Sequence, residues 1–71
     1  MSQPERGAAI HVEPHYGRWA VRHSAHAVPL SVHDEAGAAT RAAHAHAGRH
    51  LQVLLRDLYG RVHELRHTEA K

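Results

Sequence analysis

Apolar and polar residues alternate along two stretches near the start of the chain, residues 9–13 and residues 18–23. In the first stretch Ile10 and Val12 fall on one face of an extended chain, and His11 falls on the other. This period of two is typical of a β-strand with one buried face. The second stretch repeats the pattern, so the two stretches predict a pair of neighbouring strands.

The tripeptide Tyr-Gly-Arg occurs twice, at Tyr16-Gly17-Arg18 and at Tyr59-Gly60-Arg61. Each copy lies between two apolar-rich runs, and glycine allows the positive φ that a tight strand reversal requires. The second copy separates residues 51–56 from residues 61–66. Both copies therefore predict β-hairpins, one in each half of the chain.

An alanine-rich stretch joins the two hairpins and predicts a helix, after a short extended segment at residues 31–33. Asp34 is expected to cap the start of this helix through its side chain, with Glu35 at the positive end of the helix dipole. Gly48 is expected to end the helix. The predicted inner face of the helix carries Ala39, Ala43, His46 and Ala47.

These elements predict one α+β domain at residues 9–67, with tails at residues 1–8 and 68–71. The predicted order is strand–strand–helix–strand–strand. The two β-hairpins are expected to share one antiparallel sheet, and the single helix is expected to cover one face of that sheet.

Composition narrows the class of protein. The chain has 71 residues, no cysteine and a formal charge of +2 with its histidines neutral. Without cysteine there are no disulfides, thiolate metal sites or cysteine nucleophiles. Neither a signal peptide nor a membrane span is recognisable, so a cytoplasmic location is expected.

Four short segments resemble a family of small bacterial proteins known as domain of unknown function 2188. The resemblance spans roughly residues 10–66 and implies a compact α+β fold of the same element order, with no established activity to carry over. Three features depart from the family pattern: Tyr59-Gly60 in the second turn, the small side chains of the helix, and His46 on its inner face. The segments are Ile10-His11-Val12-Glu13-Pro14, Gly17-Arg18-Trp19-Ala20-Val21, Val32-His33-Asp34 and Gly60-Arg61-Val62-His63-Glu64.

The chain is rich in histidine, with ten residues of this type. His46 and His50 stand four apart and would reach one metal ion if the helix continued past Gly48. The alternative is that the histidines are scattered over the surface, and no cofactor is predicted. Glu13 and Glu64 fall on different predicted strands with nothing to pair them as acid and base, so neither an enzyme nor a small-molecule substrate is predicted.

The run of leucine and valine at residues 53–55 cannot be buried on one face of a sheet, because consecutive side chains point to opposite faces. Exposed apolar side chains in so small a domain favour association. Leu54, Leu58 and Leu65 are therefore expected to form a contact surface. The predicted function is a protein-interaction or self-associating module, with a homo-oligomer such as a dimer.

The alternative prediction is a weakly basic nucleic-acid-binding protein. Arg18 and Arg22 share the outward face of their predicted strand, and Arg61 follows the second turn. Tyr16 and Tyr59 at the turn tips are candidates for stacking on bases.

Overall fold

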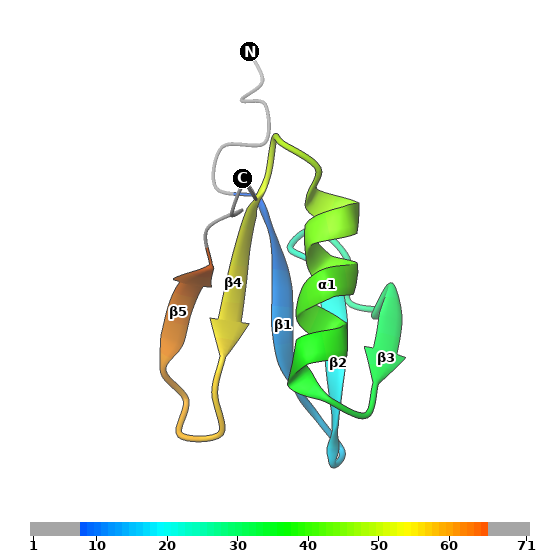
Figure 1. Ribbon diagram of the computed structural model, residues 1–71, viewed down its shortest axis with the longest axis vertical. Helices are drawn as coiled ribbons and strands as arrows, with labels where there is room; N and C mark the ends of the chain where they lie inside the picture. Colours follow the sequence, from blue (N-terminus) through cyan, green and yellow to red (C-terminus); the bar gives the residue numbers. More distant parts are fainter. Residues whose placement is uncertain (1–7, 66–71) are drawn as a thin grey trace.

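The computed structural model describes residues 8–65, which form a five-stranded sheet and one helix (Figure 1). Residues 1–7 of the predicted N-terminal tail, and residues 66–71, lie outside the described part of the chain. The elements in chain order are β1 (Ala9–His15), β2 (Arg18–His23), β3 (Ser31–His33), α1 (Ala36–Ala47), β4 (Gln52–Arg56) and β5 (Val62–Leu65).

The sheet has the strand order β3-β2-β1-β4-β5. Both predicted hairpins are confirmed, since β1 pairs with β2 and β4 pairs with β5 in antiparallel fashion. The prediction of an entirely antiparallel sheet is wrong, because β1 and β4 run parallel, with Ile10 beside Val53 and Val12 beside Leu55. The helix is the reason: α1 runs back along the sheet, so that β4 starts at the same end as β1 (Figure 1).

β1 also continues through Pro14, where the sequence indicated a strand end. A proline inside a central strand removes one backbone donor from the sheet. Pro14 lies beyond Val12, the last residue of β1 that pairs with β4. The missing N–H therefore falls where the parallel ladder has already ended.

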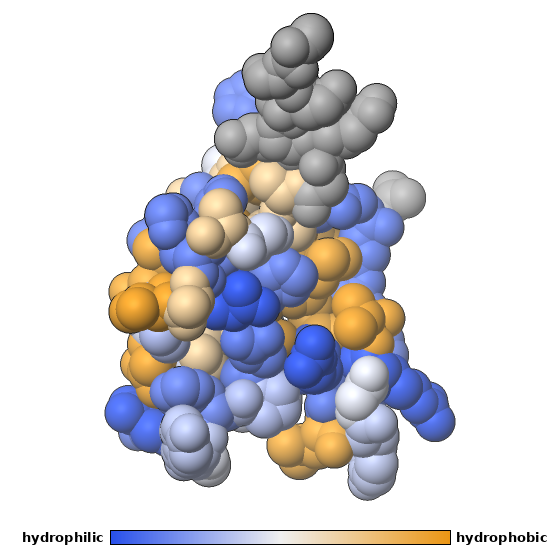
Figure 2. Space-filling model, turned by 180° about the vertical axis from the view of Figure 1, so that it is seen from behind, coloured by the Kyte–Doolittle hydropathy of each residue, from blue (hydrophilic) through white to orange (hydrophobic). Residues whose placement is uncertain are grey.

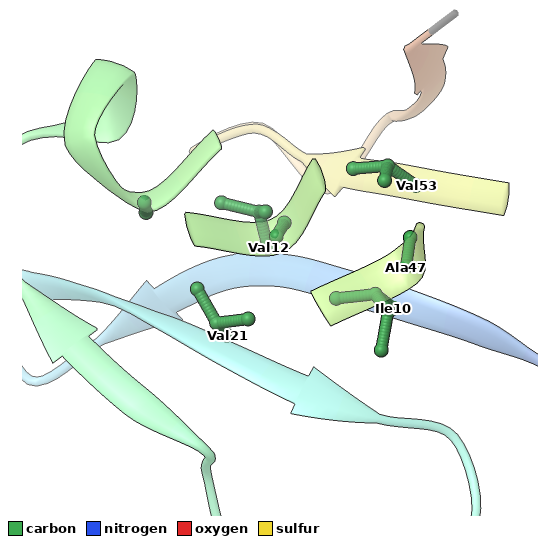
Figure 3. Packing of buried hydrophobic residues seen from close by; sticks show 7 residues of the cluster. Ile10, Val12, Val21, Ala47 and Val53 are labelled. Atoms are coloured by element: carbon green, nitrogen blue, oxygen red, sulfur yellow. The ribbon is translucent and has the colours of Figure 1, made fainter. Parts of the chain in front are cut away.

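The core lies between α1 and one face of the sheet, and its largest fully buried side chains are Ile10, Val12 and Val21. Trp19, which lies on the same face of β2 as Val21, packs against this core. The helix contributes only small side chains, which allow its axis to lie close to the strands (Figure 3). Its buried residues are Ala39, Ala43 and Ala47.

Two details of the predicted helix are wrong. His46 is exposed rather than on the inner face, because the buried stripe follows the four-residue spacing of the alanines. Glu35, not Asp34, occupies the N-cap position, and no side chain caps the helix there. The Asp34 carboxylate accepts a hydrogen bond from Arg18 instead. The predicted end of the helix is confirmed, since Gly48 follows Ala47 with a φ of 61°.

The opposite face of the sheet carries no helix and is largely polar (Figure 2). Glu13 and Arg22 form its best-buried ion pair, with side chains about one-fifth exposed (20% and 24%). Leu54 lies on this helix-free face because it pairs laterally with His11 and Glu64. The consecutive apolar residues of β4 are thus divided between the two faces, as the sequence predicted.

Candidate binding site at one end of the sheet

The parallel pairing of β1 with β4 brings the two Tyr-Gly-Arg segments to the same end of the molecule (Figure 1). β1 and β4 finish side by side, so the turn after β1 and the loop after β4 project from one edge. We call this region the turn end and define it as residues 15–18 and residues 57–61. With antiparallel pairing of these two strands, the turns would have projected from opposite edges.

The turn between β1 and β2 is a two-residue loop, because His15 and Arg18 are directly paired. Tyr16 and Gly17 have φ values of 51° and 82°, as a type I′ turn requires. A bulky residue in the left-handed region costs roughly 1–2 kcal/mol. Tyr16 adopts this conformation although it is 94% exposed and makes only an edge-on contact with the His15 ring. Packing therefore does not explain a tyrosine at this position.

The loop between β4 and β5 is organised by Asp57. One oxygen of its carboxylate accepts hydrogen bonds from the backbone N–H groups of Tyr59 and Arg61, each at 2.9 Å. The other oxygen lies 3.0 Å from Nε2 of His63. The bond to His63, together with the two backbone bonds, lowers the pKa of Asp57 and keeps it ionised. This arrangement fixes the loop while Tyr59 stays 86% exposed at its tip.

The two arginines of the repeated tripeptide differ in their partners. Arg18 forms an exposed ion pair with Asp34 at 2.8 Å. Such a pair contributes little in water, so an incoming anion competes with it at small cost. Within residues 8–65, no carboxylate forms a salt bridge with Arg61. Both guanidinium groups are therefore accessible to a ligand at the turn end.

Arg22, the third arginine of the predicted nucleic-acid site, lies away from the turn end and is held by the fold. Its guanidinium donates to both oxygens of Glu13, at 2.9 and 3.4 Å, and to the carbonyl of His26 at 3.2 Å. The bond to Glu13 raises the pKa of Arg22 and lowers that of Glu13. Arg22 therefore stabilises the helix-free face and the loop after β2.

The three leucines predicted as a contact surface lie in three different places. Leu54 is half-buried on the helix-free face, and Leu65 packs against the core on the helix side. Leu58 is 74% exposed beside Tyr59 in the β4–β5 loop. Only Leu58 lies at the turn end, so the three do not form a common surface.

The helix does not continue far enough to meet the condition on which the predicted metal pair, His46 and His50, depended. The condition for it was a helix running past Gly48, and α1 ends at Ala47, before His50. Among residues 8–65, no group of three or more histidine, aspartate or glutamate side chains is arranged to hold a metal ion. At the end of the sheet opposite the turn end there is an open hollow of about 390 Å³. It is lined in part by His44, Arg49, His50, Gln52, Glu64 and Leu65.

Sequence reasoning identified the tyrosines and arginines of the turn end as candidates, but it did not predict that the two turns lie at the same end of the sheet. One signal was present: a single helix between two hairpins returns the chain along the sheet, and this favours parallel entry of the next strand.

No helix within residues 8–65 is long and apolar enough to cross a membrane. Comparisons with protein-family models, curated proteins and solved structures find no match to this chain.

Proposed function

We propose that this protein is a non-enzymatic, cytoplasmic nucleic-acid-binding module whose contact surface is the turn end. The observation that carries the proposal is the placement of both Tyr-Gly-Arg segments at one edge of the sheet. Four of the five residues of the predicted nucleic-acid site lie together there: Tyr16, Arg18, Tyr59 and Arg61. Exposed tyrosines supply π-faces for bases, and arginine guanidinium groups pair with phosphates.

The local charge limits the expected strength of binding. Asp34, Glu35 and Asp57 lie at or beside the turn end and offset the arginines. Two phosphate contacts, one for each arginine of the repeated tripeptide, would give a salt slope of about −1.4 for a single strand. A dissociation constant in the micromolar range or weaker, about 10⁻⁴ to 10⁻⁶ M, is therefore expected.

Fluorescence anisotropy with a labelled ten-residue oligothymidylate tests this proposal. Binding should weaken about sevenfold between 50 and 200 mM salt, which is the consequence of that slope. The double variant Arg18→Ala, Arg61→Ala should bind several-fold more weakly and lose most of the salt dependence. Arg49→Ala, an exposed arginine at the opposite end, is the matched control and should bind as the wild type does. Absence of wild-type binding at low salt would rule the function out.

A second candidate function, self-association, is favoured by the free edge of β5. No strand among residues 8–65 pairs with the outer side of β5, and an open edge is a ready template for another strand. Val62 on this strand is 58% exposed on the helix-free face, diagonally across from Leu54. A second copy of the chain pairing along β5 would place a strand directly beside Val62.

Size-exclusion chromatography with light scattering tests this second candidate. A dimer of the wild-type chain that Val62→Glu converts to a monomer would support it. Val28→Glu alters an exposed valine in the loop after β2 and is the matched control, which should stay dimeric. A wild-type monomer at high micromolar concentration would exclude self-association through β5.

A further inference from the structure

We infer that the ligand of the turn end is a single strand of nucleic acid that stacks one base on Tyr16 and another on Tyr59 at the same time. This inference rests on the proposed function and specifies its ligand. The two tyrosines are the most exposed large hydrophobic residues among residues 8–65. They lie on separate turns that project from the same edge.

The spacing of the two turns determines which bases they can engage. The turn joining β1 to β2 and the loop joining β4 to β5 are centred two strand spacings apart. At about 4.8 Å for each spacing, the separation is about 10 Å. Neighbouring bases in a stacked strand are about 3.4 Å apart. A strand that keeps this rise therefore places two nucleotides between the base on one ring and the base on the other.

The same spacing selects against a duplex. The faces of bases inside a duplex are covered by their stacked neighbours, whereas an unpaired strand can splay its bases onto aromatic side chains. Two rings on separate protrusions need two such free faces on one strand. The turn end should therefore prefer a single strand to a duplex of the same sequence.

Each turn supplies the same two groups in the same order. An exposed tyrosine ring is followed, two residues later, by an exposed arginine. The ring takes a base, and the guanidinium group lies close enough along the chain to pair with the phosphate beside that base. Leu58 adds exposed apolar surface next to Tyr59. The turn end thus carries two copies of one nucleotide-binding unit.

Binding to both units at once predicts a dependence on the length of the strand. A dinucleotide is too short to reach from one ring to the other, whereas a hexanucleotide spans them. Engagement of the second unit by a bridging strand is intramolecular, and its effective concentration is then far above that of the free ligand. Affinity should therefore rise at least tenfold from the dinucleotide to the hexanucleotide, and much less from the hexanucleotide to the decanucleotide.

Anisotropy titrations of oligothymidylates with the tyrosine variants test the inference. Tyr16→Ala and Tyr59→Ala should each weaken hexanucleotide binding at least fivefold, and the double variant should abolish the advantage of the hexanucleotide over the dinucleotide. Tyr16→Phe and Tyr59→Phe keep the rings and should bind within twofold of the wild type. Circular dichroism of each variant confirms that the fold is retained, since both side chains point into solvent.

Three results would overturn the inference. The first is a double alanine variant that binds as the wild type does, while Arg18→Ala, Arg61→Ala loses binding; the proposed function would then stand on its arginines alone. The second is equal affinity for the single strand and the duplex. The third, absence of binding to any of these probes, would remove the proposed function as well.

Discussion

Val12 of β1 lies directly beside Leu55 of β4 in a parallel register. This direction of pairing decides where the rest of the molecule places its exposed aromatic residues. Because the two strands end at one edge, Tyr16 and Tyr59 project from the same end of the sheet although they are 43 positions apart in the sequence. The topology of two buried strands therefore sets the geometry of the proposed site.

Tyr16→Asn should stabilise the fold and weaken binding. Asparagine adopts the left-handed conformation of this type I′ turn more readily than tyrosine, so the free energy of unfolding should rise by roughly 1 kcal/mol. The same change removes one of the two stacking rings. Urea denaturation and oligonucleotide titration of the one variant measure both effects. A variant that is more stable and binds equally well would separate Tyr16 from the proposed function.

Ala43→Leu should destabilise the domain because Ala43 is fully buried where α1 lies against the sheet. Added methyl groups in a packed core cost about 1–3 kcal/mol. Ala45→Leu makes the same chemical change on the exposed side of the helix and should alter the free energy of unfolding by less than about 0.5 kcal/mol. Equal effects of the two substitutions in thermal denaturation would contradict the close packing of α1.

Two glycine substitutions should act in opposite directions. Gly37 lies in α1, and an added Cβ would meet only the Arg41 side chain at 3.9 Å, so Gly37→Ala should stabilise the domain by roughly 0.5–1 kcal/mol. Gly60 has a φ of 86°, and Gly60→Ala should destabilise the domain by about 1 kcal/mol. Chemical denaturation of the pair checks the assignment of helix and turn. Stabilisation by Gly60→Ala would show that the β4–β5 loop has another conformation.

Stability should fall in two steps as the pH is lowered. Burial, and then the nearby charge of Arg22, lower the pKa of His11 below 6.5, so protonation of His11 opposes folding as the pH falls below 6.5. The hydrogen bond from Arg22 lowers the pKa of Glu13 below 4.5, and the stability from this ion pair is present above pH 4.5 and lost as the pH falls through the lowered pKa.

Urea denaturation across this pH range separates the two groups. His11→Gln should flatten the step just below pH 6.5, and Glu13→Gln should flatten the step below pH 4.5. Glu13→Gln should also cost about 1 kcal/mol near neutral pH, because Arg22 loses its charged partner. Unchanged pH profiles in both variants would contradict the assigned interactions.

The sequence predicted what depends on neighbouring residues. Both hairpins follow from the alternation of apolar residues and from glycines at the reversals, and the end of α1 follows from Gly48. The parallel pairing of β1 with β4 was missed because it joins residues more than 40 positions apart, and only the return of the chain through the single helix indicated it. The predicted leucine surface failed for the same reason, since the side that Leu65 faces depends on where the helix lies over the sheet.

The predicted helix-capping role of Asp34 was wrong for a second reason, a competing side-chain partner. By local pattern it is a good helix cap, but Arg18 from the start of β2 donates to its carboxylate at 2.8 Å and so competes with the helix for it. Arg22 was predicted as a nucleic-acid contact, but its guanidinium group donates to Glu13 on the neighbouring strand instead. A side chain's role is read poorly from sequence wherever a long-range partner competes with the local one.

The distance between positions 16 and 59 tests the central claim most directly. The chain has no cysteine, so Tyr16→Cys, Tyr59→Cys accepts two nitroxide labels at defined places. Electron paramagnetic resonance should give a separation below about 20 Å, since the turns are about 10 Å apart and the labels add their own length. Turns at opposite ends would lie about 20 Å apart along the strands as well as about 10 Å apart across them, and the two labels would point away from each other, so a separation of about 30 Å or more would contradict the shared turn end.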